Sequence, residues 1–539
     1  MPFRRDIHTT PAAIYETLAD LPSLDFDYII VGGGTAGNVL ANRLTEQPNT
    51  SVLVLEAGRS TADVLASQIP FFCFSPPTLL NWNFTTTLQP GLNNRSFPYY
   101  RGFGLGGCSA INIMTYTRGS SEDYDRYARV SGDEGWGWDR MQPYFRKYPS
   151  AIDGRVIQAT KEVPDEFPFN LDYNSGYHLG IGWHQKTIGN GTRSTSETSY
   201  LAPEYINREN LHVLVNSHVT RILAANGSSV DNRPYFDAVE FTQDAGTHKE
   251  IILSAGVIGT PHILLNSGVG DAEVLSALGV TSTVHLPDVG NNFREQLNWA
   301  LNWAVNDTNT IENVYWRNAT FQEEAMTEWQ ASRTGYLANS PSNQLGSFRV
   351  NEGLLEEEPC AGNRTGHYEL IFTGGIPIGA VPQTGSFLGI SITVLCPLSY
   401  GNVSINSTNP LSPPVINPNT LSHEQDLVLM EQAVAGAQRF VSAPVWKDYV
   451  LGLVTDITDL EGSIRSRAMP GGHAVGTASM SPPDARWGVV DPDSRLRRAR
   501  GVRIVDASVL PYIPAGHTQA AVYAVAERAA DLIKGRESS

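Results

Sequence analysis

Two histidines near the C-terminus are the side chains best suited to acid–base chemistry. His473 follows Gly472, and His517 follows Gly516. Because glycine has no side chain, a ligand can approach both imidazole rings closely. Imidazole exchanges a proton near neutral pH, so the pair could take or deliver a proton during a reaction. A lone histidine in such a loop is usually structural, and the functional interpretation depends on there being two.

A glycine motif near the N-terminus is typical of dinucleotide binding. Gly32, Gly34 and Gly37 have the spacing G-x-G-x-x-G, with Thr35 and Ala36 inside the turn. The motif follows an apolar, strand-like run at 26–31 and precedes a helix-compatible stretch at 38–44. A second strand at 52–55 ends in Glu56, whose carboxylate can accept ribose hydroxyl groups. Pyrophosphate would then lie at the helix N-terminus, where free N–H groups favour negative charge.

Two further glycine-rich blocks suit a backbone that lies flat against a ring. Four of the seven residues from 101 to 107 are glycine, and this block continues to Gly119. The second block follows a strand at 250–253 and runs from Ser254 to Gly270. Either block alone could be an ordinary turn, because glycine disfavours both helix and strand interiors.

The predicted strands and helices around these residues indicate an α/β fold. We expect two domains, of α+β organisation. A buried strand at 502–506 precedes a final helix at 518–534, whose first half is apolar on all sides. This helix begins directly after His517, and the positive end of its dipole can point at a ligand. We predict a Rossmann-like dinucleotide domain at 23–310 and 465–539, discontinuous and interleaved with parts of a substrate-binding domain. The substrate-binding domain itself is predicted at 311–464.

In this order, the four motifs resemble those of the glucose-methanol-choline (GMC) oxidoreductases over nearly the whole chain. The resemblance is nearest to fungal aryl-alcohol oxidases, through residues 38–45, 132–136, 475–480 and 487–493. It implies FAD, a flavin domain of p-hydroxybenzoate-hydroxylase type and a sheet-and-helix substrate domain. It also implies that His473 is the base, that His517 holds the substrate hydroxyl, and that the flavin takes the hydride. The other implied cofactor-binding residues are Arg101, Gly106, Gly107, Ser109, Asn112, Val219, Ala255, Gly256, Asp506, Ala507, Thr518 and Gln519.

The chain also departs from the family pattern. Members with covalent flavin carry a histidine within 107–114, and this sequence has none there, so we expect noncovalent FAD. Val257 replaces a small residue, and Glu-Gln at 295–296 stands where the family favours Asp-His. Gly472 and Ile113 occupy positions where aryl-alcohol oxidases place aromatic side chains. These two replacements predict a wide entrance that admits furanic or aliphatic unsaturated alcohols.

Composition limits the possible partners to small molecules. The 539 residues carry a net charge of -17, which repels nucleic acid and anionic lipid. No apolar run reaches 18 residues, so we expect no contact with a membrane. The cysteines have no C-x-x-C spacing and we expect no metal, although Cys360 and Cys396 could pair. We expect a monomer.

The expected location is extracellular, with the signal peptide absent from this sequence. The N-terminal residues contain no apolar stretch. However, there are ten Asn-x-Ser/Thr glycosylation acceptors, against about three expected by chance. They are Asn49, Asn83, Asn94, Asn190, Asn226, Asn306, Asn318, Asn363, Asn402 and Asn406.

The expected function is the FAD-dependent oxidation of primary aryl, allylic or furanic alcohols to aldehydes. Dioxygen would be reduced to hydrogen peroxide, with a quinone-reducing dehydrogenase as the alternative. A second alternative is a hydroxynitrile lyase of the same family, which keeps flavin and two histidines but performs no net redox reaction. A light-driven fatty acid decarboxylase is disfavoured because its tunnel does not require two histidines. A noncatalytic flavin-binding protein would have no reason to keep the pair.

Overall fold

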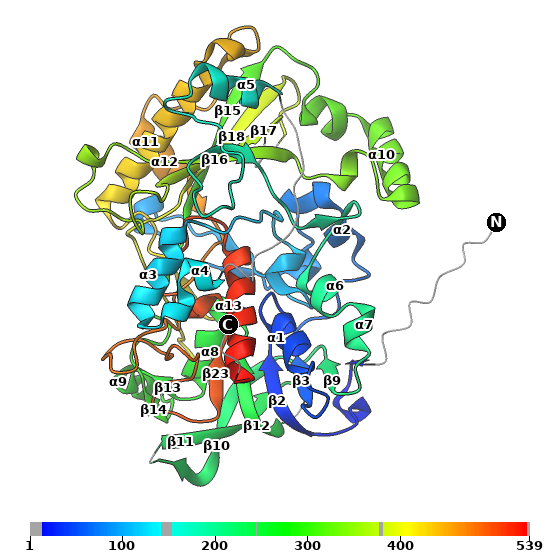
Figure 1. The fold of residues 1–539 in the computed structure, drawn as a ribbon, viewed down its shortest axis with the longest axis vertical. Coiled ribbons are helices and arrows are strands. Elements are labelled where there is room, and N and C mark those ends of the chain that lie inside the picture. Colours follow the sequence, from blue (N-terminus) through cyan, green and yellow to red (C-terminus); the bar gives the residue numbers. More distant parts are fainter. Residues whose placement is uncertain (1–12, 142–153, 232, 244, 377–380, 536–539) are drawn as a thin grey trace, which may run out of the picture.

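A sheet of eight strands forms the lower half of the protein in the computed structural model (Figure 1). The structure describes residues 13–141, 154–231, 233–243, 245–376 and 381–535. The strand order is β1-β9-β3-β2-β12-β11-β10, and β23 pairs with β12. The strands are β1 (Ile14–Tyr15), β2 (Asp25–Val31), β3 (Val52–Leu55), β9 (Leu211–Leu214), β10 (Val219–Val230), β11 (Arg233–Phe241), β12 (Ala245–Leu253) and β23 (Val502–Ile504).

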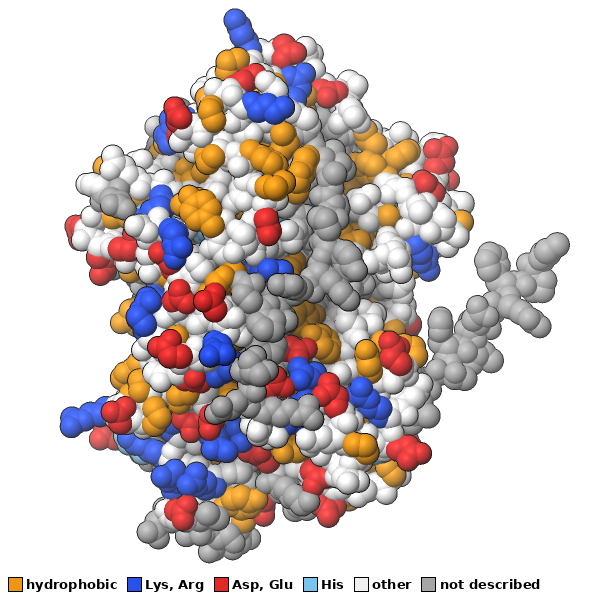
Figure 2. Space-filling model, viewed as in Figure 1, with side chains coloured by type: hydrophobic (Ala, Val, Ile, Leu, Met, Phe, Trp, Pro, Cys, Tyr) orange, Lys and Arg blue, Asp and Glu red, His pale blue; other side chains and the backbone are white. Residues whose placement is uncertain are grey.

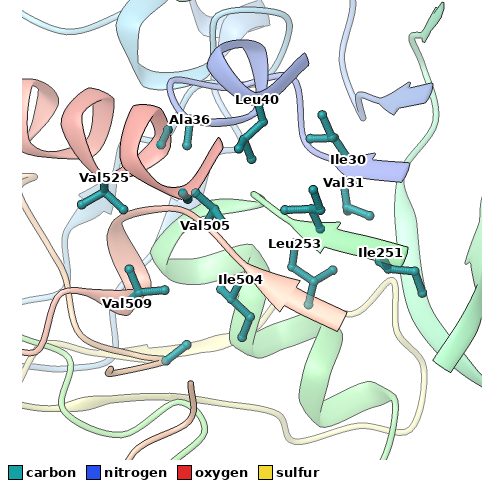
Figure 3. Close-up of a cluster of buried hydrophobic side chains, with 14 of the residues drawn as sticks. Ile30, Val31, Ala36, Leu40, Ile251, Leu253, Ile504, Val505, Val509 and Val525 are labelled. Atoms are coloured by element: carbon teal, nitrogen blue, oxygen red, sulfur yellow. The ribbon is translucent and has the colours of Figure 1, made fainter. Parts of the chain in front are cut away.

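The centre of this sheet is parallel and apolar. β2 pairs in parallel with β3 and β12, and β12 pairs in parallel with β23. Helix α1 (Gly37–Leu44) packs on it and helix α13 (Thr518–Ile533) packs against α1, so that Leu40, Val525 and Ile30 belong to one buried cluster (Figure 3). The close approach requires glycine at position 37, because a Cβ there would lie 1.9 Å from the Gly32 carbonyl oxygen.

The structure confirms the elements predicted around the motifs. β2 and β3 coincide with the predicted strands, α1 with the predicted first helix, and α13 with the final helix. The predicted strand at 502–506 is shorter, because Asp506 caps the turn that follows it. The first half of α13 is buried, as its composition indicates. The α/β fold with a second sheet is therefore confirmed.

A second sheet of six strands forms the upper half (Figure 1). Its order is β16-β17-β18-β15-β21, with β22 beside β15. The strands are β15 (Leu297–Val305), β16 (Ser342–Phe348), β17 (Tyr368–Thr373), β18 (Phe387–Val394), β21 (Val450–Leu453) and β22 (Met469–Pro470). β15 lies before residue 311 and β22 after residue 464, so strands of this sheet come from both sides of those positions.

The two faces of the second sheet differ in chemistry. Along β15, buried Leu297, Trp299 and Leu301 alternate with partly exposed Asn298 and Ala300. The apolar face joins a core with helix α11 (Glu424–Val441), whose Leu429 and Phe440 are buried. The opposite face is thereby left to line the region between the two sheets.

Further helices and short strands complete the two halves. The helices are α2 (Leu65–Gln68), α3 (Ser121–Ser131), α4 (Trp138–Met141), α5 (Gly154–Glu162), α6 (Ser196–Tyr200), α7 (Pro203–Ile206), α8 (Gly256–Asn266), α9 (Ala272–Ala277), α10 (Ala319–Ser332) and α12 (Leu460–Arg467). The strands are β4 (Phe84–Thr85), β5 (Pro98–Tyr99), β6 (Gly180–Trp183), β7 (Ile188–Gly189), β8 (Thr192–Arg193), β13 (Val269–Gly270), β14 (Val284–His285), β19 (Asn402–Ser404) and β20 (Val415–Asn417). Within the described ranges, no helix has both the length and the apolar character needed to cross a bilayer.

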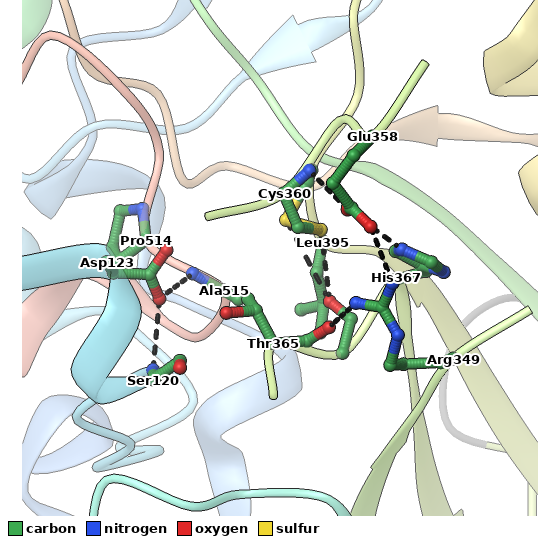
Figure 4. The surroundings of a disulfide bond; sticks show 12 residues. Ser120, Asp123, Arg349, Glu358, Cys360, Thr365, His367, Leu395, Pro514 and Ala515 are labelled. Atoms are coloured by element: carbon green, nitrogen blue, oxygen red, sulfur yellow. Dashed lines mark hydrogen bonds and ion pairs between the residues drawn. A yellow bond between two sulfur atoms is a disulfide. The ribbon is translucent and has the colours of Figure 1, made fainter. Parts of the chain in front are cut away.

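Cys360 and Cys396 form a disulfide bond between the segment before β17 and the segment after β18 (Figure 4). The bond packs against Leu395 and Ala515, and Ala515 lies two residues before His517. The backbone N–H of Ala515 donates to Asp123 Oδ2 at 2.9 Å. The disulfide therefore packs against the loop that carries His517.

Candidate functional site

The structure brings His473 and His517 together. His473 Nε2 lies 3.1 Å from His517 Nδ1, and the two ring centroids are 4.5 Å apart. His473 lies in the loop that follows β22, and His517 is the N-cap of α13. Because these segments are 44 residues apart in the chain, only the fold creates the pair.

Two consecutive residues hold His473. Glu295 Oε1 accepts the His473 backbone N–H at 2.8 Å, and Gln296 Oε1 lies 2.7 Å from His473 Nδ1. Arg101 Nη1 donates to the Gly472 carbonyl at 2.9 Å, which fixes the preceding residue. Burial raises the pKa of Glu295, and the Arg101 cation opposes that rise. Both the backbone and the ring of His473 are thus immobilised.

The surroundings of Gln296 decide which nitrogen of His473 carries a proton. Gln296 Nε2 lies 2.9 Å from the Leu395 carbonyl and 3.3 Å from the carbonyls of Pro514 and Gly516. Three acceptors can only be served by the NH₂ end of the amide, so the Gln296 oxygen must face the histidine. His473 Nδ1 therefore donates to Gln296, and the lone pair of the neutral ring lies on Nε2, which faces His517 Nδ1 at 3.1 Å.

His517 is held by a buried carboxylate from the second sheet. Glu369, on β17, has Oε1 at 2.9 Å from His517 Nε2, and its other oxygen accepts the Tyr173 hydroxyl at 3.0 Å. The side chain of Glu369 is fully buried. Glu369 thus holds the His517 ring from the side opposite His473.

The environment of His473 keeps its imidazole neutral. Burial lowers the pKa of His473 well below its usual value of 6.5, and the neighbouring His517 and the Arg101 cation lower the pKa further. A neutral ring with its lone pair on Nε2 is the form that can accept a proton. His473 is therefore in the form that can act as a base at neutral pH.

The first glycine motif and Glu56 form one end of a dinucleotide cradle. Glu56, at the end of β3, accepts the backbone N–H groups of Gly33, Gly58 and Gly104 at 2.9, 2.9 and 3.1 Å. It therefore ties together the turn at 32–37, the loop after β3 and the second glycine block. The Ser217 N–H donates to the Glu56 carbonyl at 2.8 Å, which places the start of β10 and buried Val219 at this end.

The glycines of the motifs leave the space that a flat cofactor needs. A Cβ on Gly34 would meet only Gly107 Cα at 3.8 Å, and a Cβ on Gly256 would meet nothing within 4 Å. Gly256 also has φ +78°, a conformation that favours glycine. Ala255 precedes it as the N-cap of α8. These positions fit FAD, because a dinucleotide lies close to the protein backbone and glycine leaves the space for that approach.

The N-terminus of α13 supplies polar groups at the other end of the cradle. Thr518 and Gln519 open this helix, and the His517 side chain forms no capping hydrogen bond to it. Gln519 Oε1 accepts Asn112 Nδ2 at 2.7 Å, while Gln519 Nε2 is buried and has no partner among the described residues. An unpaired buried N–H and free helix N–H groups fit the flavin carbonyl oxygens and their partial negative charge.

Other predicted cofactor-binding residues form hydrogen bonds to protein groups and thereby shape the cradle. Ser109 Oγ donates to the Gly106 carbonyl at 2.6 Å, which shapes the second glycine block. Asp506 accepts the Gly256 N–H at 2.9 Å and the Thr260 hydroxyl at 2.6 Å, and Ala507 follows it. The Arg101 guanidinium contacts Gly472 and the Tyr99 hydroxyl, so in this structure it serves the His473 loop.

Sequence reasoning missed Glu369 and the role of Gln296. Glu369 lies in an apolar strand of a segment with no recognised motif, and its only signal is an acid within a buried run. Gln296 was noted only as a departure from the family pattern. The contacts of both become visible only when the second sheet is placed against the two histidines.

Gly472, beside His473, has space around it: a Cβ there would have Arg101 Nη1 as its nearest neighbour, at 4.0 Å. The wide entrance expected from the sequence stays a prediction. Elsewhere, Glu358, Cys360 and His367 come close together (Figure 4), but the Cys360 sulfur is used in the disulfide and cannot act as a thiolate ligand.

Comparisons with known proteins agree with this geometry. Family models described as GMC oxidoreductase match residues 26–298 and 397–526. Dehydrogenase eriK of Hericium erinaceus is 40% identical, over 97% of this chain and 96% of that protein. Pyranose dehydrogenase 3 of Leucoagaricus meleagris is 38% identical, with the same coverage.

Solved structures share the whole fold. A formate oxidase variant of Aspergillus oryzae is 26% identical with a TM-score of 0.87, covering 95% of this chain and 98% of that one. A fungal aryl-alcohol oxidase is 26% identical with a TM-score of 0.78, covering 95% and 99%. The chain therefore belongs to the GMC oxidoreductase family and is an FAD-binding oxidoreductase.

Proposed function

We propose that this protein oxidises an alcohol to a carbonyl compound with His473 as the base. The observation that carries the proposal is the histidine pair, whose nitrogens lie 3.1 Å apart and are held by Gln296 on one side and Glu369 on the other. Such a pair can take the hydroxyl proton of an alcohol and hold its oxygen at the same time. Bound FAD supplies the hydride acceptor.

The two rings have different tasks. His473 Nε2 has the lone pair of the neutral ring and accepts the hydroxyl proton. His517, whose Nδ1 faces His473 Nε2, holds the substrate oxygen. Glu369 keeps His517 in this orientation through Nε2, at 2.9 Å. The α13 N-terminus stabilises negative charge that develops beside it during the reaction.

The proposed substrates are primary alcohols of the aryl, allylic or furanic type, oxidised to aldehydes. The similarity to an aryl-alcohol oxidase and the open position at Gly472 support this choice. The proposed electron acceptor is dioxygen, which yields hydrogen peroxide. Relatives named pyranose dehydrogenases favour a second candidate, a dehydrogenase that reduces quinones and accepts sugars.

We also propose a secreted, glycosylated and monomeric protein with noncovalent FAD. Of the nine acceptor asparagines whose exposure the structure describes, eight are exposed and Asn402 is partly buried. The Cys360–Cys396 disulfide suits an oxidising compartment. Acidic and basic side chains are interspersed over the face seen in Figure 2, which suits a soluble enzyme with small neutral substrates.

Anaerobic mixing with an alcohol panel tests the proposed function. We expect at least one benzylic, allylic, furanic or sugar alcohol to bleach the flavin absorbance. Peroxide formation after oxygen is admitted would identify an oxidase, and preferential quinone reduction a dehydrogenase. A panel without any bleaching would refute alcohol oxidation, and cyanide release from mandelonitrile would instead identify a lyase.

Substitution of the two histidines should give unequal losses. We expect His473→Ala to slow flavin reduction roughly 100- to 10,000-fold, because the proton acceptor is removed. His517→Asn should lose less, because an amide can still donate a hydrogen bond. Stopped-flow reduction of variants that retain FAD measures both rates. A larger loss for His517→Asn would reverse the assignment.

The acid limb of the pH profile should lie below pH 6.5. The pKa of His473 is lowered, so its neutral form persists as the pH falls through 6.5 and disappears only when the pH passes the lowered value. The measurement is the rate constant of flavin reduction from pH 4 to 8, a range chosen to bracket an ordinary histidine. A limb at or above 6.5 would contradict the burial argument.

Gln296 should act as a positioning residue for His473. Gln296→Met removes the acceptor of His473 Nδ1–H, and we expect flavin reduction to slow roughly tenfold. Gln296→Glu places a carboxylate there, which favours protonated His473 and should move the acid limb to higher pH. Gln330→Met, on the exposed face of α10, is the matched control. An unchanged limb in Gln296→Glu would exclude this role.

A further inference from the structure

A buried arginine holds the glycine block at 101–119 from behind. Arg193, at the end of β8, is buried, and its Nε donates to the Ser67 carbonyl at 2.8 Å. Its Nη1 donates to both oxygens of Asn112, to the backbone carbonyl at 2.6 Å and to Oδ1 at 2.9 Å. The block that shapes the cofactor cradle is therefore attached to a guanidinium group.

This guanidinium group has no counter-charge in the protein. Among the described residues, no carboxylate forms an ion pair with Arg193, and the titratable group that interacts with it is the Cys73 thiol. Burial lowers the pKa of Arg193 to about 10, so the side chain stays charged at neutral pH. Burial raises the pKa of Cys73, so the thiol stays neutral and cannot balance that charge.

A second cation lies on the same side of the cradle. Lys186 also interacts with Cys73, and burial lowers the pKa of its ammonium group to about 8. Burying a cation without a partner of opposite charge costs free energy, and the carbonyl groups that Arg193 contacts could be served by a neutral donor. The retained charge therefore indicates an anionic partner that the polypeptide does not supply.

A chain of hydrogen bonds leads from Arg193 to the cofactor end of α13. Asn112 Oδ1 accepts two donors, Arg193 Nη1 and the Met114 backbone N–H, each at 2.9 Å. Because neither donor can accept a hydrogen bond, these contacts identify the oxygen of the Asn112 amide. Its Nδ2 therefore faces Gln519 Oε1, at 2.7 Å, in the first turn of α13. One residue, Asn112, separates the Arg193 cation from Gln519.

A positive charge in this position favours the reduced form of bound flavin. Reduction adds electrons to the flavin, and a cation in a buried environment stabilises the additional negative charge. The positive end of α13 acts in the same direction. A charged donor also polarises the amide that it binds, so that Asn112 donates more strongly to Gln519.

We propose that Arg193 is a positioning residue that acts through Asn112 and raises the reduction potential of the bound FAD. It supplies the positive charge that balances the reduced flavin, and it acts on the cofactor rather than on the substrate. This inference requires FAD binding but no particular alcohol, so it goes beyond the proposed function.

The reduction potential of the flavin tests this role directly. FAD-loaded protein is reduced slowly without oxygen in the presence of a dye of known potential. In Arg193→Met, we expect the ratio of reduced to oxidised flavin at a fixed potential to fall roughly tenfold, which for two electrons is about 30 mV. In Arg193→Lys the charge is kept, and the ratio should stay within about twofold of the wild type.

Arg95→Met is the matched control. Arg95 also donates to backbone carbonyls, those of Leu92 at 3.2 Å and Arg465 at 3.0 Å, and burial also lowers its pKa. Its neighbour Leu92 belongs to the core of the second sheet, away from the cradle. The flavin potential should therefore remain at the wild-type value in this variant.

The outcomes distinguish an effect of charge from an effect of shape. An unchanged potential in FAD-loaded Arg193→Met would overturn the proposal, and so would equal losses in the Met and Lys variants. If Arg193→Met does not retain FAD, Arg193→Gln repeats the measurement with a neutral donor in place. Release of FAD from all three variants would assign Arg193 to cofactor binding alone and also overturn the proposal. Because the reductant is chemical, a protein that oxidises no alcohol would still give these results, so the two proposals can fail separately.

Discussion

The catalytic arrangement depends on the contact between the two sheets across the histidine pair. His517 belongs to the helix that packs on the dinucleotide sheet, whereas Glu369, which orients its ring, belongs to the second sheet. Gln296, which orients His473, directly precedes β15 of that same second sheet. Neither sheet alone holds both histidines in place. The pair is therefore assembled only when the two halves of the protein pack together.

This contact also accounts for the unusual concentration of buried polar groups. Glu295, Gln296 and Glu369 are almost completely buried, and burial of a carboxylate costs free energy unless hydrogen bonds compensate for it. Compensation comes from backbone N–H groups, the Tyr99 and Tyr173 hydroxyls and the histidines. A network satisfied in this way allows one geometry only, which suits a site whose reacting atoms must be placed within a fraction of an ångström.

The sequence predicts the dinucleotide half well, because its constraints are local. Gly37 must be glycine for α1 to approach Gly32, and Glu56 must end a strand next to the glycine turn, so both leave fixed spacings in the chain. The histidines were found for the same reason, since each has a glycine beside it. Glu369 has no such local signature, because its role comes from a contact between segments that are distant in the sequence.

The position of the disulfide bears on the order in which the chain matures. Cys360 and Cys396 flank the hairpin of β17 and β18 and are 36 residues apart, so the bond can close as soon as that hairpin forms. The segment around Ala515, which packs on the bond, emerges from the ribosome more than a hundred residues later. Oxidation can therefore precede docking, and the last part of the chain to be synthesised would meet a surface that is already covalently fixed.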